Sequence, residues 1–232
     1  MIQMVNIHKY QGMPCNNIKA SMIFLDESFL PSVLNFQQSI EKFLNDPEMF
    51  QIDSAELLQQ FIKSGKIIGV VVNGDLVAYC IIYFPQDDEY NLGFDLSFPM
   101  DLLHKTAHFE SVAVHQDYWG NSLGLILNTQ AINTMRRLEY SQVCATVSPK
   151  NIYNLSILFK TGFVIKILKI KYGGKQRYIL HKSLDKTLSF NPVNNTEIPS
   201  TNIESQIKAI EQGFWGYSIS KTPDGFNIRF GK

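Results

Sequence analysis

The sequence predicts a mixed α/β fold, in which a mixed sheet carries helices on its faces. Apolar residues recur at helical spacing in several segments, and short β-branched and aromatic runs lie between those segments. Two of these runs, 66–72 and 76–84, are joined by Asn73-Gly74, the dipeptide that tight hairpin turns prefer because both residues take positive φ. A second pair of runs is joined through Gly173-Gly174. The two hairpins flank a strand, helix, strand, helix segment, and this order predicts the mixed sheet.

The composition is that of an ordinary globular chain. Of its 232 residues, 45% are hydrophobic and 18% are charged, which excludes collagen, coiled coil and wholesale disorder. Lys and Arg together number 21, as do Asp and Glu, so no net charge attracts a polyanion and we expect no nucleic-acid partner. No apolar run reaches the roughly 18 residues that cross a bilayer, so we expect no membrane partner. Residues 1–13 lack the charged and apolar blocks of a signal peptide, and we expect a cytoplasmic protein.

The cysteines predict neither a disulfide nor a metal site. Cys15, Cys80 and Cys144 are widely separated, and two of them lie in apolar runs that we expect to be strands. We therefore interpret them as small buried hydrophobic residues in a reducing compartment.

The N-terminal segment is expected to contain a strand and two helices before the first hairpin. Residues 1–19 give no clear pattern, and the apolar run 21–25 predicts a strand. One helix begins near Pro31, because proline is tolerated in a first turn, and the next follows a capping residue, Asp53 or Ser54. The apolar stripes of these helices are Val33, Phe36, Ile40, Phe43 and Leu44, and then Leu57, Leu58, Phe61 and Ile62.

Residues 85–104 are expected to be irregular. A connection of this length inside a compact domain is either functional or mobile. It is rich in carboxylates, which form either a solvated loop or a surface that attracts a cationic amine. These carboxylates are Asp87, Asp88, Glu89, Asp95 and Asp101.

The middle of the chain alternates strands and helices. A strand is predicted at 108–114, and the helix after it carries Leu127, Ala131, Met135 and Leu138 on one face. A second strand is predicted at 143–147, and a second helix begins at Asn151 and ends at Gly162. The second hairpin follows and consists of 163–172 and 176–182.

We expect residues 1–184 to form the main domain and residues 185–232 to form a C-terminal extension. Residues 185–202 are rich in Asn, Pro, Ser and Thr and indicate a linker or an extended strap. A short helix ending at Gly213 and a hairpin about residues 223–225 follow. This hairpin has too few strands to stand alone, so it must add to the main sheet or to another subunit, and a homodimer is one such arrangement.

The segment after Phe109 carries the chemistry. A strand there leads through a glycine-containing loop into a helix, whose first amides have no partner within the helix and can hold a phosphate. The small residues Gly120, Ser122 and Gly124 let the backbone approach a ligand closely.

This segment resembles the acetyl-CoA-binding motif of the GNAT N-acetyltransferases. The similarity comprises Val112-Ala113-Val114, a short spacer, and Trp119-Gly120-Asn121-Ser122-Leu123-Gly124. Downstream, the spacing of Asn151, Asn154, Phe159 and Gly162-Phe163 is similar to that of the family's second CoA-contacting helix and the strand after it. The resemblance spans roughly residues 66–183.

The resemblance implies a fold, a cofactor and a reaction. The implied fold is a GNAT-like mixed α/β (α+β) fold with a central, mostly antiparallel sheet splayed between two strands, helices on both faces, and a C-terminal helix and β-hairpin extension. The co-substrate is acetyl-CoA, with no metal. A primary amine, on a small molecule or a protein, attacks the thioester directly, and the backbone NH of Val114 polarises its carbonyl. The implied CoA contacts are Val112, Ala113, Val114, Trp119, Gly120, Asn121, Ser122, Leu123, Gly124, Asn151, Asn154 and Phe159.

The sequence departs from the family pattern at three positions. The family motif begins with Arg or Gln and has Gly at its fourth position, where this chain has Trp119 and Ser122. Leu158 stands where many members carry a Tyr that protonates the departing thiolate. A thiol with a pKa of roughly 8.5 leaves without much help near neutral pH, so the reaction does not depend on that acid.

Glu110 is the candidate for the general base. It lies four residues before Val114, on the same face by the two-residue strand period, and could take the proton of the amine directly or through water. His108 shares that face and is either a second candidate or a structural histidine. His104 and His108 lack a third ligand nearby, so no metal site is predicted.

Two other functions fit parts of the pattern. Residues 120–124 also spell the nucleophile elbow of serine hydrolases, with Ser122 as nucleophile, although the spacing after Val114 and the order of possible triad partners fit that class poorly. A non-catalytic acyl-CoA-binding or interaction protein would account for Trp119, Ser122 and Leu158.

Overall fold

The computed structural model describes residues 3–8, 17–44, 46, 48–186, 188 and 195–232. The chain forms two compact units. The first comprises Met1–Phe84 with Phe109–Met135, and the second comprises Pro85–His108 with Arg136–Lys232. Strand β5 (Thr106–Val114) and helix α5 (Leu123–Arg137) therefore contribute residues to both.

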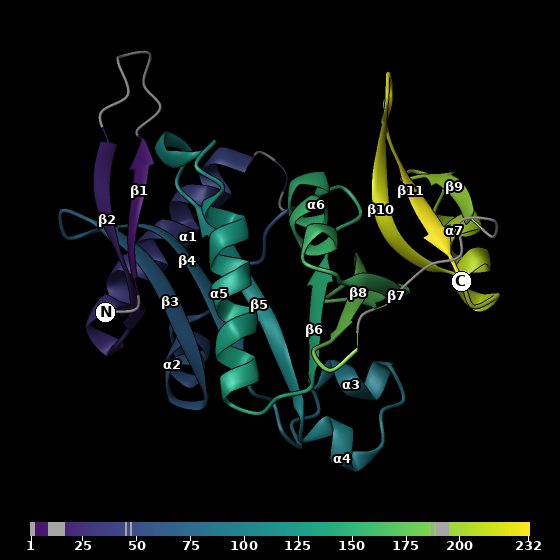
Figure 1. Ribbon diagram of the computed structural model, residues 1–232, viewed down its shortest axis with the longest axis horizontal. Helices are drawn as coiled ribbons and strands as arrows, with labels where there is room; N and C mark the ends of the chain where they lie inside the picture. The colour runs from purple at the N-terminus through teal and green to yellow at the C-terminus, as the bar shows by residue number, and fades with distance from the viewer. Residues whose placement is uncertain (1–2, 9–16, 45, 47, 187, 189–194) are drawn as a thin grey trace. The chain divides into compact units, whose positions relative to one another are not determined.

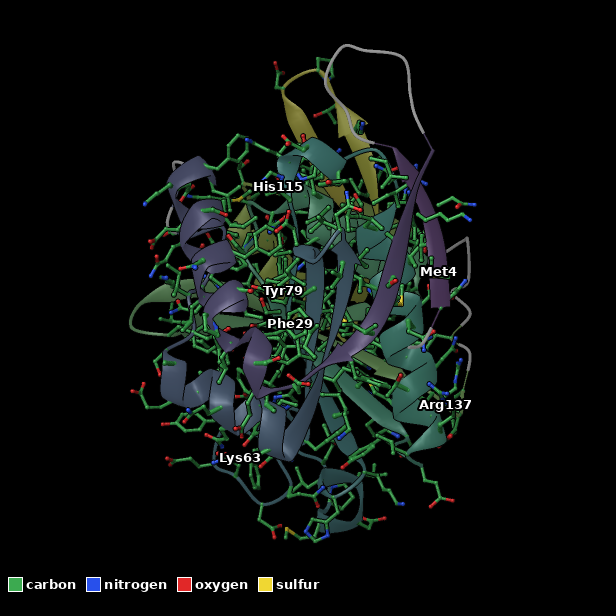
Figure 2. The ribbon with its side chains drawn as sticks, turned by 90° about the vertical axis from the view of Figure 1, so that its left-hand side faces the viewer. Met4, Phe29, Lys63, Tyr79, His115 and Arg137 are labelled. Carbon is green, nitrogen blue, oxygen red and sulfur yellow. The ribbon has the colours of Figure 1, made fainter. Side chains whose placement is uncertain are left out.

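The first unit is a sheet with helices on both faces. Its strands follow the order β1-β2-β3-β4-β5. Helices α1 and α2 cover one face and α5 covers the other, as Figures 1 and 2 both show. Its elements are β1 Gln3–His8, β2 Asn17–Leu25, η1 Glu27–Phe29, α1 Leu30–Leu44, α2 Ala55–Ser64, β3 Gly65–Val72, β4 Asp75–Tyr83, most of β5, η2 Gln116–Tyr118 and most of α5.

Strand β4 separates the two sides of this unit. Tyr79, Ile81 and Tyr83 pack into a core with residues of α1 and α2. The intervening Cys80 faces the other way, and its thiol lies 3.8 Å from the Leu127 carbonyl oxygen on α5. The two-residue period of the strand thus places different side chains under α1 and α5.

The second unit is also built on a sheet. From the first residues of β5 its strands follow the order β5-β6-β8-β7-β10-β11-β9. The β5–β6 ladder is parallel, whereas the other ladders resolved within this unit are antiparallel. Its elements are α3 Leu92–Asp95, α4 Met100–Leu103, β6 Gln142–Val147, α6 Ile152–Lys160, β7 Val164–Lys171, β8 Lys175–Ser183, β9 Asn195–Pro199, α7 Ile203–Glu211, β10 Trp215–Thr222 and β11 Gly225–Gly231.

The C-terminal hairpin joins the sheet of the second unit, as one of the two expected arrangements requires. Gly216 on β10 pairs with Ile165 on β7. A buried hydrogen bond joins helix α7 to strand β8: the Tyr178 hydroxyl donates to Gln206 Oε1 at 2.5 Å. Residues 195–232 and the strands of the second hairpin therefore belong to one compact unit.

The expected fold class and most of the expected elements are confirmed. The sheet is mixed and mostly antiparallel, with helices on its faces, and the turn at Asn73 and Gly74 has φ of 51° and 94°. Ser54 caps α2, because its hydroxyl accepts from the Leu57 amide at 3.2 Å. Cys80 and Cys144 are buried free thiols in strands, and Cys15 lies outside the described residues.

One expectation was wrong, and two strands were not foreseen. The segment 85–104, expected to be irregular, contains two short helices, α3 and α4, which bury Leu92 and Leu103. Strand β1 lies within residues 1–19, whose pattern predicted no particular element, and buries Val5 and Ile7 at alternate positions. Strand β9 lies in the segment expected to be a linker or an extended strap, and it pairs with β11 along its length. No helix in the described ranges has both the length and the apolar character needed to span a bilayer.

Candidate functional site

The loop between β5 and α5 has a shape fixed by hydrogen bonds within the first unit. Strand β5 ends at Val114, and the His115 amide donates to the Val77 carbonyl oxygen on β4 at 2.9 Å. A 3-10 turn follows, in which the Tyr118 amide donates to the His115 carbonyl oxygen at 2.9 Å. Tyr118, the last residue of this turn, is buried. Hydrogen bonds therefore hold the backbone just after Val114 at both the amide and the carbonyl oxygen of His115.

Two residues of this loop have left-handed backbone conformations. Gly120 has φ of 81° and Ser122 has φ of 57°. Such a conformation costs a non-glycine residue about 1–2 kcal/mol. Ser122 thus has the kind of backbone conformation for which glycine, the family's residue at this position, is best suited. The departure from the family pattern at Ser122 leaves a left-handed turn in place.

The first turn of α5 offers amide donors. The Ile126 amide donates to the Ser122 carbonyl oxygen at 3.0 Å, which starts the helical ladder. The preceding amides, of Leu123, Gly124 and Leu125, have no partner within the helix, as in every α-helix. At Gly120, a Cβ would meet no atom within 4 Å among the described residues other than its chain neighbours. Backbone donors at a positive helix end suit an anionic group such as a diphosphate.

Trp119 fastens the loop to the end of β5. Its indole Nε1–H donates to the Val114 carbonyl oxygen at 2.9 Å. Its ring meets that of Phe43 on α1 edge to face, with centroids 5.3 Å apart. The indole N–H is used within the chain, so a CoA contact by Trp119 would come from its ring; the residue as a whole is 47% exposed.

The rest of the predicted contact segment lies on β5 and in the loop. Ala113 is buried in the core that α1 and α2 cover, whereas Val112 and Val114 are half-buried. The Asn121 side chain donates to the Tyr118 carbonyl oxygen at 2.9 Å, so Asn121 also shapes the loop.

The two candidate bases have different surroundings. Glu110 is half-buried on β5 and lies close enough to Asp53 to affect its pKa. His108 is buried, and its Nε2 accepts from the Leu92 amide at 3.0 Å within the second unit. This bond gives His108 a structural role, and Glu110 stays the predicted base.

A polar group that the sequence did not suggest lies under α1. Gln37 and Asp53 are buried and exchange two hydrogen bonds, from Gln37 Nε2 to Asp53 Oδ2 and from the Asp53 amide to Gln37 Oε1, each 2.8 Å long. Burial raises the pKa of the Asp53 carboxyl, the bond from Gln37 lowers it, and the Glu110 charge raises it, giving a pKa of about 6. Gln37 follows Val33 by four residues and so lies on the apolar stripe of α1. A polar residue on that stripe was the one feature of the sequence that could have pointed to this buried pair.

The remaining predicted CoA contacts lie in the second unit on α6. The Asn151 side chain caps this helix by accepting from the Asn154 amide at 3.0 Å. The side-chain oxygen of Asn154 is buried and finds no partner among the described residues, so it can accept a hydrogen bond from a ligand. Leu158 is fully buried in the core. It cannot supply the acid that a Tyr supplies elsewhere in the family.

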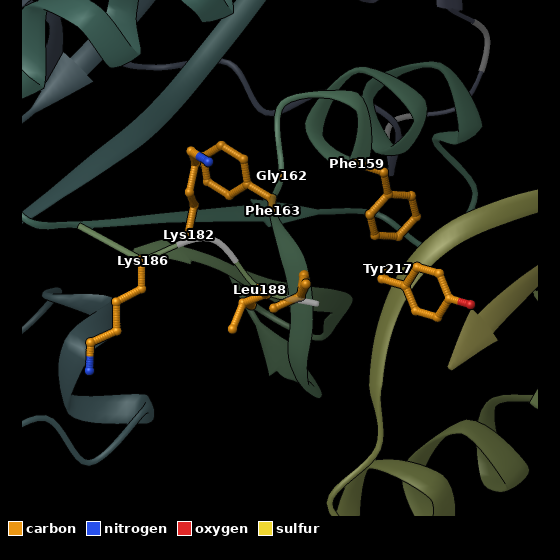
Figure 3. Close-up of a pocket in the computed structure, with 8 residues that line it drawn as sticks. Phe159, Gly162, Phe163, Lys182, Lys186, Leu188 and Tyr217 are labelled. Atoms are coloured by element: carbon orange, nitrogen blue, oxygen red, sulfur yellow. The ribbon is translucent and has the colours of Figure 1, made fainter. Parts of the chain in front are cut away.

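Phe159 lines a cavity of about 210 Å³ in the second unit (Figure 3). The rings of Phe159 and Tyr217 lie on one side of this cavity and Lys186 on the other. The lining consists of Phe159, Gly162, Phe163, Val164, Lys182, Lys186, Leu188 and Tyr217.

The parallel ladder between β5 and β6 is short. It contains three pairs, from Thr106–Gln142 to His108–Cys144. Residues 110–114, which include the predicted base and the predicted carbonyl-polarising amide, lie beyond it. Across the described residues, no three His, Cys, Asp or Glu side chains gather in a way that would hold a metal ion.

Comparison with known proteins identifies the family. The model of the acetyltransferase (GNAT) family matches residues 32–163. This range contains the loop, the first turn of α5 and helix α6. A search of curated protein sequences returned no match.

Solved structures share the fold at low sequence identity. The ribosomal-protein-S18-alanine N-acetyltransferase from Escherichia coli is 14% identical, over 75% of this chain and 97% of that chain, with a TM-score of 0.53. A putative acetyltransferase from Salmonella typhimurium, solved with its cofactor acetyl-CoA, is 15% identical over 73% and 96%, with a TM-score of 0.55. A putative acetyltransferase from Acinetobacter baylyi ADP1 is 17% identical over 74% and 96%, with a TM-score of 0.56.

The family match covers more than half of the chain, and the fold agrees with it. The family uses acetyl-CoA as its co-substrate. The chain therefore belongs to the GNAT acetyltransferase family.

Proposed function

We propose that this protein is an N-acetyltransferase that moves the acetyl group of acetyl-CoA to a primary amine by direct attack in a ternary complex. One observation carries the proposal: the loop after Val114, held by its own hydrogen bonds, leads into the first turn of α5, where the amides of Leu123, Gly124 and Leu125 have no partner within the helix. Diphosphate bound there would place the arm of the cofactor near the end of β5. The Salmonella typhimurium structure was solved with acetyl-CoA, which supports the same cofactor here.

The chemistry follows from few groups. The amine gives up a proton to Glu110, and its lone pair then attacks the thioester carbonyl, whose oxygen is stabilised by the Val114 amide. A C–N bond forms and the C–S bond breaks. The thiolate leaves without a protein acid, and a proton from the new amide nitrogen or from solvent neutralises it. Positioning supplies much of the rate in such a reaction.

The acceptor is proposed to be a primary amine on a small molecule or a protein. The Escherichia coli relative is described as acting on an alanine of ribosomal protein S18, so a protein amine is one such acceptor.

Calorimetric titration with acetyl-CoA, followed by thiol release with spermidine, tyramine and a peptide with a free N-terminal alanine, tests the proposal. We expect saturable binding, turnover with at least one amine, and a loss of roughly 10²-fold or more in kcat for Glu110→Gln. Glu41→Gln, an exposed carboxylate on α1, is the matched control and should leave kcat unchanged.

The other outcomes point to other functions. Absence of acetyl-CoA binding contradicts the proposal. Binding without turnover over the amine panel indicates an acyl-CoA-binding protein, and stoichiometric labelling of Ser122 by a fluorophosphonate indicates a hydrolase.

A further inference from the structure

The cavity of about 210 Å³ in the second unit is lined by two aromatic rings and a lysine (Figure 3). The rings are those of Phe159, in the last turn of α6, and Tyr217 on β10, and the lysine is Lys182 near the end of β8. A dry cavity of about 150 Å³ can bind one benzene molecule, so this cavity has room for one ring and a short polar substituent. Its lining lies wholly within one compact unit.

This cavity lies at the opposite end of α6 from the start of the helix, where the other CoA contacts of the second unit are predicted. Asn151 caps the start of α6 and Gly162 follows its end, and the nine helical residues between them span about 13 Å. The neighbouring strand agrees, because β6 begins beside Lys182, which pairs with Val143, and ends four residues before Asn151. Phe159 therefore lines a place that is separate from the start of α6.

A β-bulge positions Tyr217 in the lining. Gly216 pairs with Phe230 and Ser218 pairs with Arg229, so Tyr217 is an extra residue in the ladder with β11. Such bulges redirect a side chain and are frequent next to functional sites. Strand β10 also contacts α6, and Figure 3 shows the rings from these two elements on the same side of the cavity. The C-terminal extension thus supplies one of the two rings.

The ammonium group of Lys182 is half-buried, and the described residues give it no carboxylate partner. A Cβ on Gly162, another residue of the lining, would lie 2.8 Å from Lys182 Nζ, so the glycine leaves the space that the ammonium group occupies. Burial lowers the pKa of Lys182, and the charge of Arg136 lowers it further. A half-buried cation beside another cation is unfavourable, and an anion in the cavity would relieve it.

The end of α6 does not need Lys182 as a cap. Three backbone amides already donate to carbonyl oxygens of its last turn, and they belong to Thr161, Gly162 and Phe163. Gly162 has φ of 86°, the left-handed conformation that commonly ends a helix in this way. The fold therefore leaves the Lys182 ammonium group available to a ligand.

We propose that this cavity binds a small aromatic carboxylate, whose ring packs against Phe159 and Tyr217 and whose carboxylate pairs with Lys182. Aromatic rings pack favourably on one another in offset or edge-to-face geometry, and an ammonium group donates charge-assisted hydrogen bonds to a carboxylate. Lys186 contributes only the stem of its side chain, since Figure 3 shows its amine directed away from the two rings. The site holds no part of acetyl-CoA, so the inference stands apart from the proposed function.

Calorimetric titration of the full chain with 3-phenylpropionate tests this site in the absence of acetyl-CoA. We expect saturable one-to-one binding with a Kd below about 1 mM. The neutral 3-phenylpropionamide has nearly the same shape and should bind about 10-fold more weakly or worse, because it cannot form an ion pair with Lys182. No saturable binding, or equal affinity for the acid and the amide, would overturn the proposal.

Two lysine variants locate the site. Lys182→Gln should weaken the binding of 3-phenylpropionate about 10-fold or more. Lys221→Gln removes an exposed lysine of β10 that lies outside the lining, and it should leave the Kd unchanged. Wild-type affinity in Lys182→Gln, or equal losses in both variants, would refute the site.

Amide NMR of the wild type keeps the inference testable if Lys182→Gln does not fold. Addition of 3-phenylpropionate should shift the amide resonances of Gly162 and Tyr217, and the absence of both shifts would refute the site. Failure of acetyl-CoA to bind would contradict the proposed function and would leave these results unaffected.

Discussion

The Trp119 indole N–H donates to the Val114 carbonyl oxygen at 2.9 Å, across the loop that joins β5 to α5. Val114 is the residue whose amide we propose as the group that polarises the thioester carbonyl. Trp119 stands where the family motif has Arg or Gln, and its bond orients the peptide unit that follows Val114. Trp119 thus makes a hydrogen bond within the chain at a position where the resemblance implies a polar contact to the cofactor.

Trp119→Phe keeps a ring against Phe43 but removes the bond to Val114. Loss of one hydrogen bond at this half-exposed position should cost roughly 0.5–1.5 kcal/mol of unfolding free energy and weaken acetyl-CoA binding severalfold. Urea denaturation and calorimetry measure the two effects. The matched control is Trp215→Phe, in β10 of the second unit, which should leave acetyl-CoA affinity unchanged; equal affinity losses in both variants would argue against a local role for Trp119.

Ser122→Gly relieves the left-handed backbone at φ of 57°. Glycine removes the backbone strain but gives the unfolded chain more conformational freedom, so we expect the free energy of unfolding to rise by at most about 1 kcal/mol. Acetyl-CoA affinity should be retained. Ser122→Ala keeps the unfavourable conformation and serves as the control. If Ser122→Gly instead abolishes activity while the protein stays folded, the hydroxyl has a chemical role and the interpretation of Ser122 as a backbone position is wrong.

The charge on Asp53 makes the stability of the protein depend on pH. Its pKa is raised from 3.8 to about 6 in the folded state, so the folded protein favours the protonated form. Stability from this group is complete below pH 3.8 and is lost as pH rises through 6, by about 3 kcal/mol in total.

Asp53→Asn removes that loss, so the stability gained over the wild type should grow between pH 5 and pH 8. Thermal unfolding across this range measures the gain, with Glu41→Gln as the control. A variant that is less stable than the wild type at pH 8 would show that the carboxylate stabilises the fold.

The bond between Tyr178 and Gln206 should decide how firmly α7 packs. Gln206 is fully buried, and its Nε2 also donates to the Pro199 carbonyl oxygen at 2.8 Å. Tyr178→Phe leaves Gln206 Oε1 without its donor and should cost about 1–3 kcal/mol, with faster hydrogen exchange in α7.

Tyr172→Phe is the control for this variant, since the Tyr172 hydroxyl meets Thr146 Oγ1 at 3.1 Å on the surface. We expect it to cost less than about 0.5 kcal/mol. Unchanged exchange in α7 for Tyr178→Phe would mean that other contacts hold this helix.

Local chemistry made much of the fold predictable. The Asn73-Gly74 turn, the cap at Asn151 and the left-handed Gly162, with φ of 86°, each determine structure within a few residues. Strand β9 could not be predicted in this way, because residues 195–199 become a strand only by pairing with β11, about thirty residues later. Strand β1 is similar, since its short alternation has meaning only beside β2.

The candidate site was predictable only in part for the same reason. The loop after Val114 has a recognisable spacing, and the structure shows how that spacing is built. The Gln37–Asp53 pair joins residues sixteen positions apart, and no spacing rule connects them. A buried polar residue on the apolar stripe of α1 is visible in the sequence, but its partner is not.

A crystal structure of the protein with acetyl-CoA tests the central claim most directly. We predict diphosphate oxygens within hydrogen-bond distance of the amides of Leu123, Gly124 and Leu125, and the thioester carbonyl oxygen at the Val114 amide. Acetyl-CoA bound elsewhere, with these amides facing only solvent, would contradict the account.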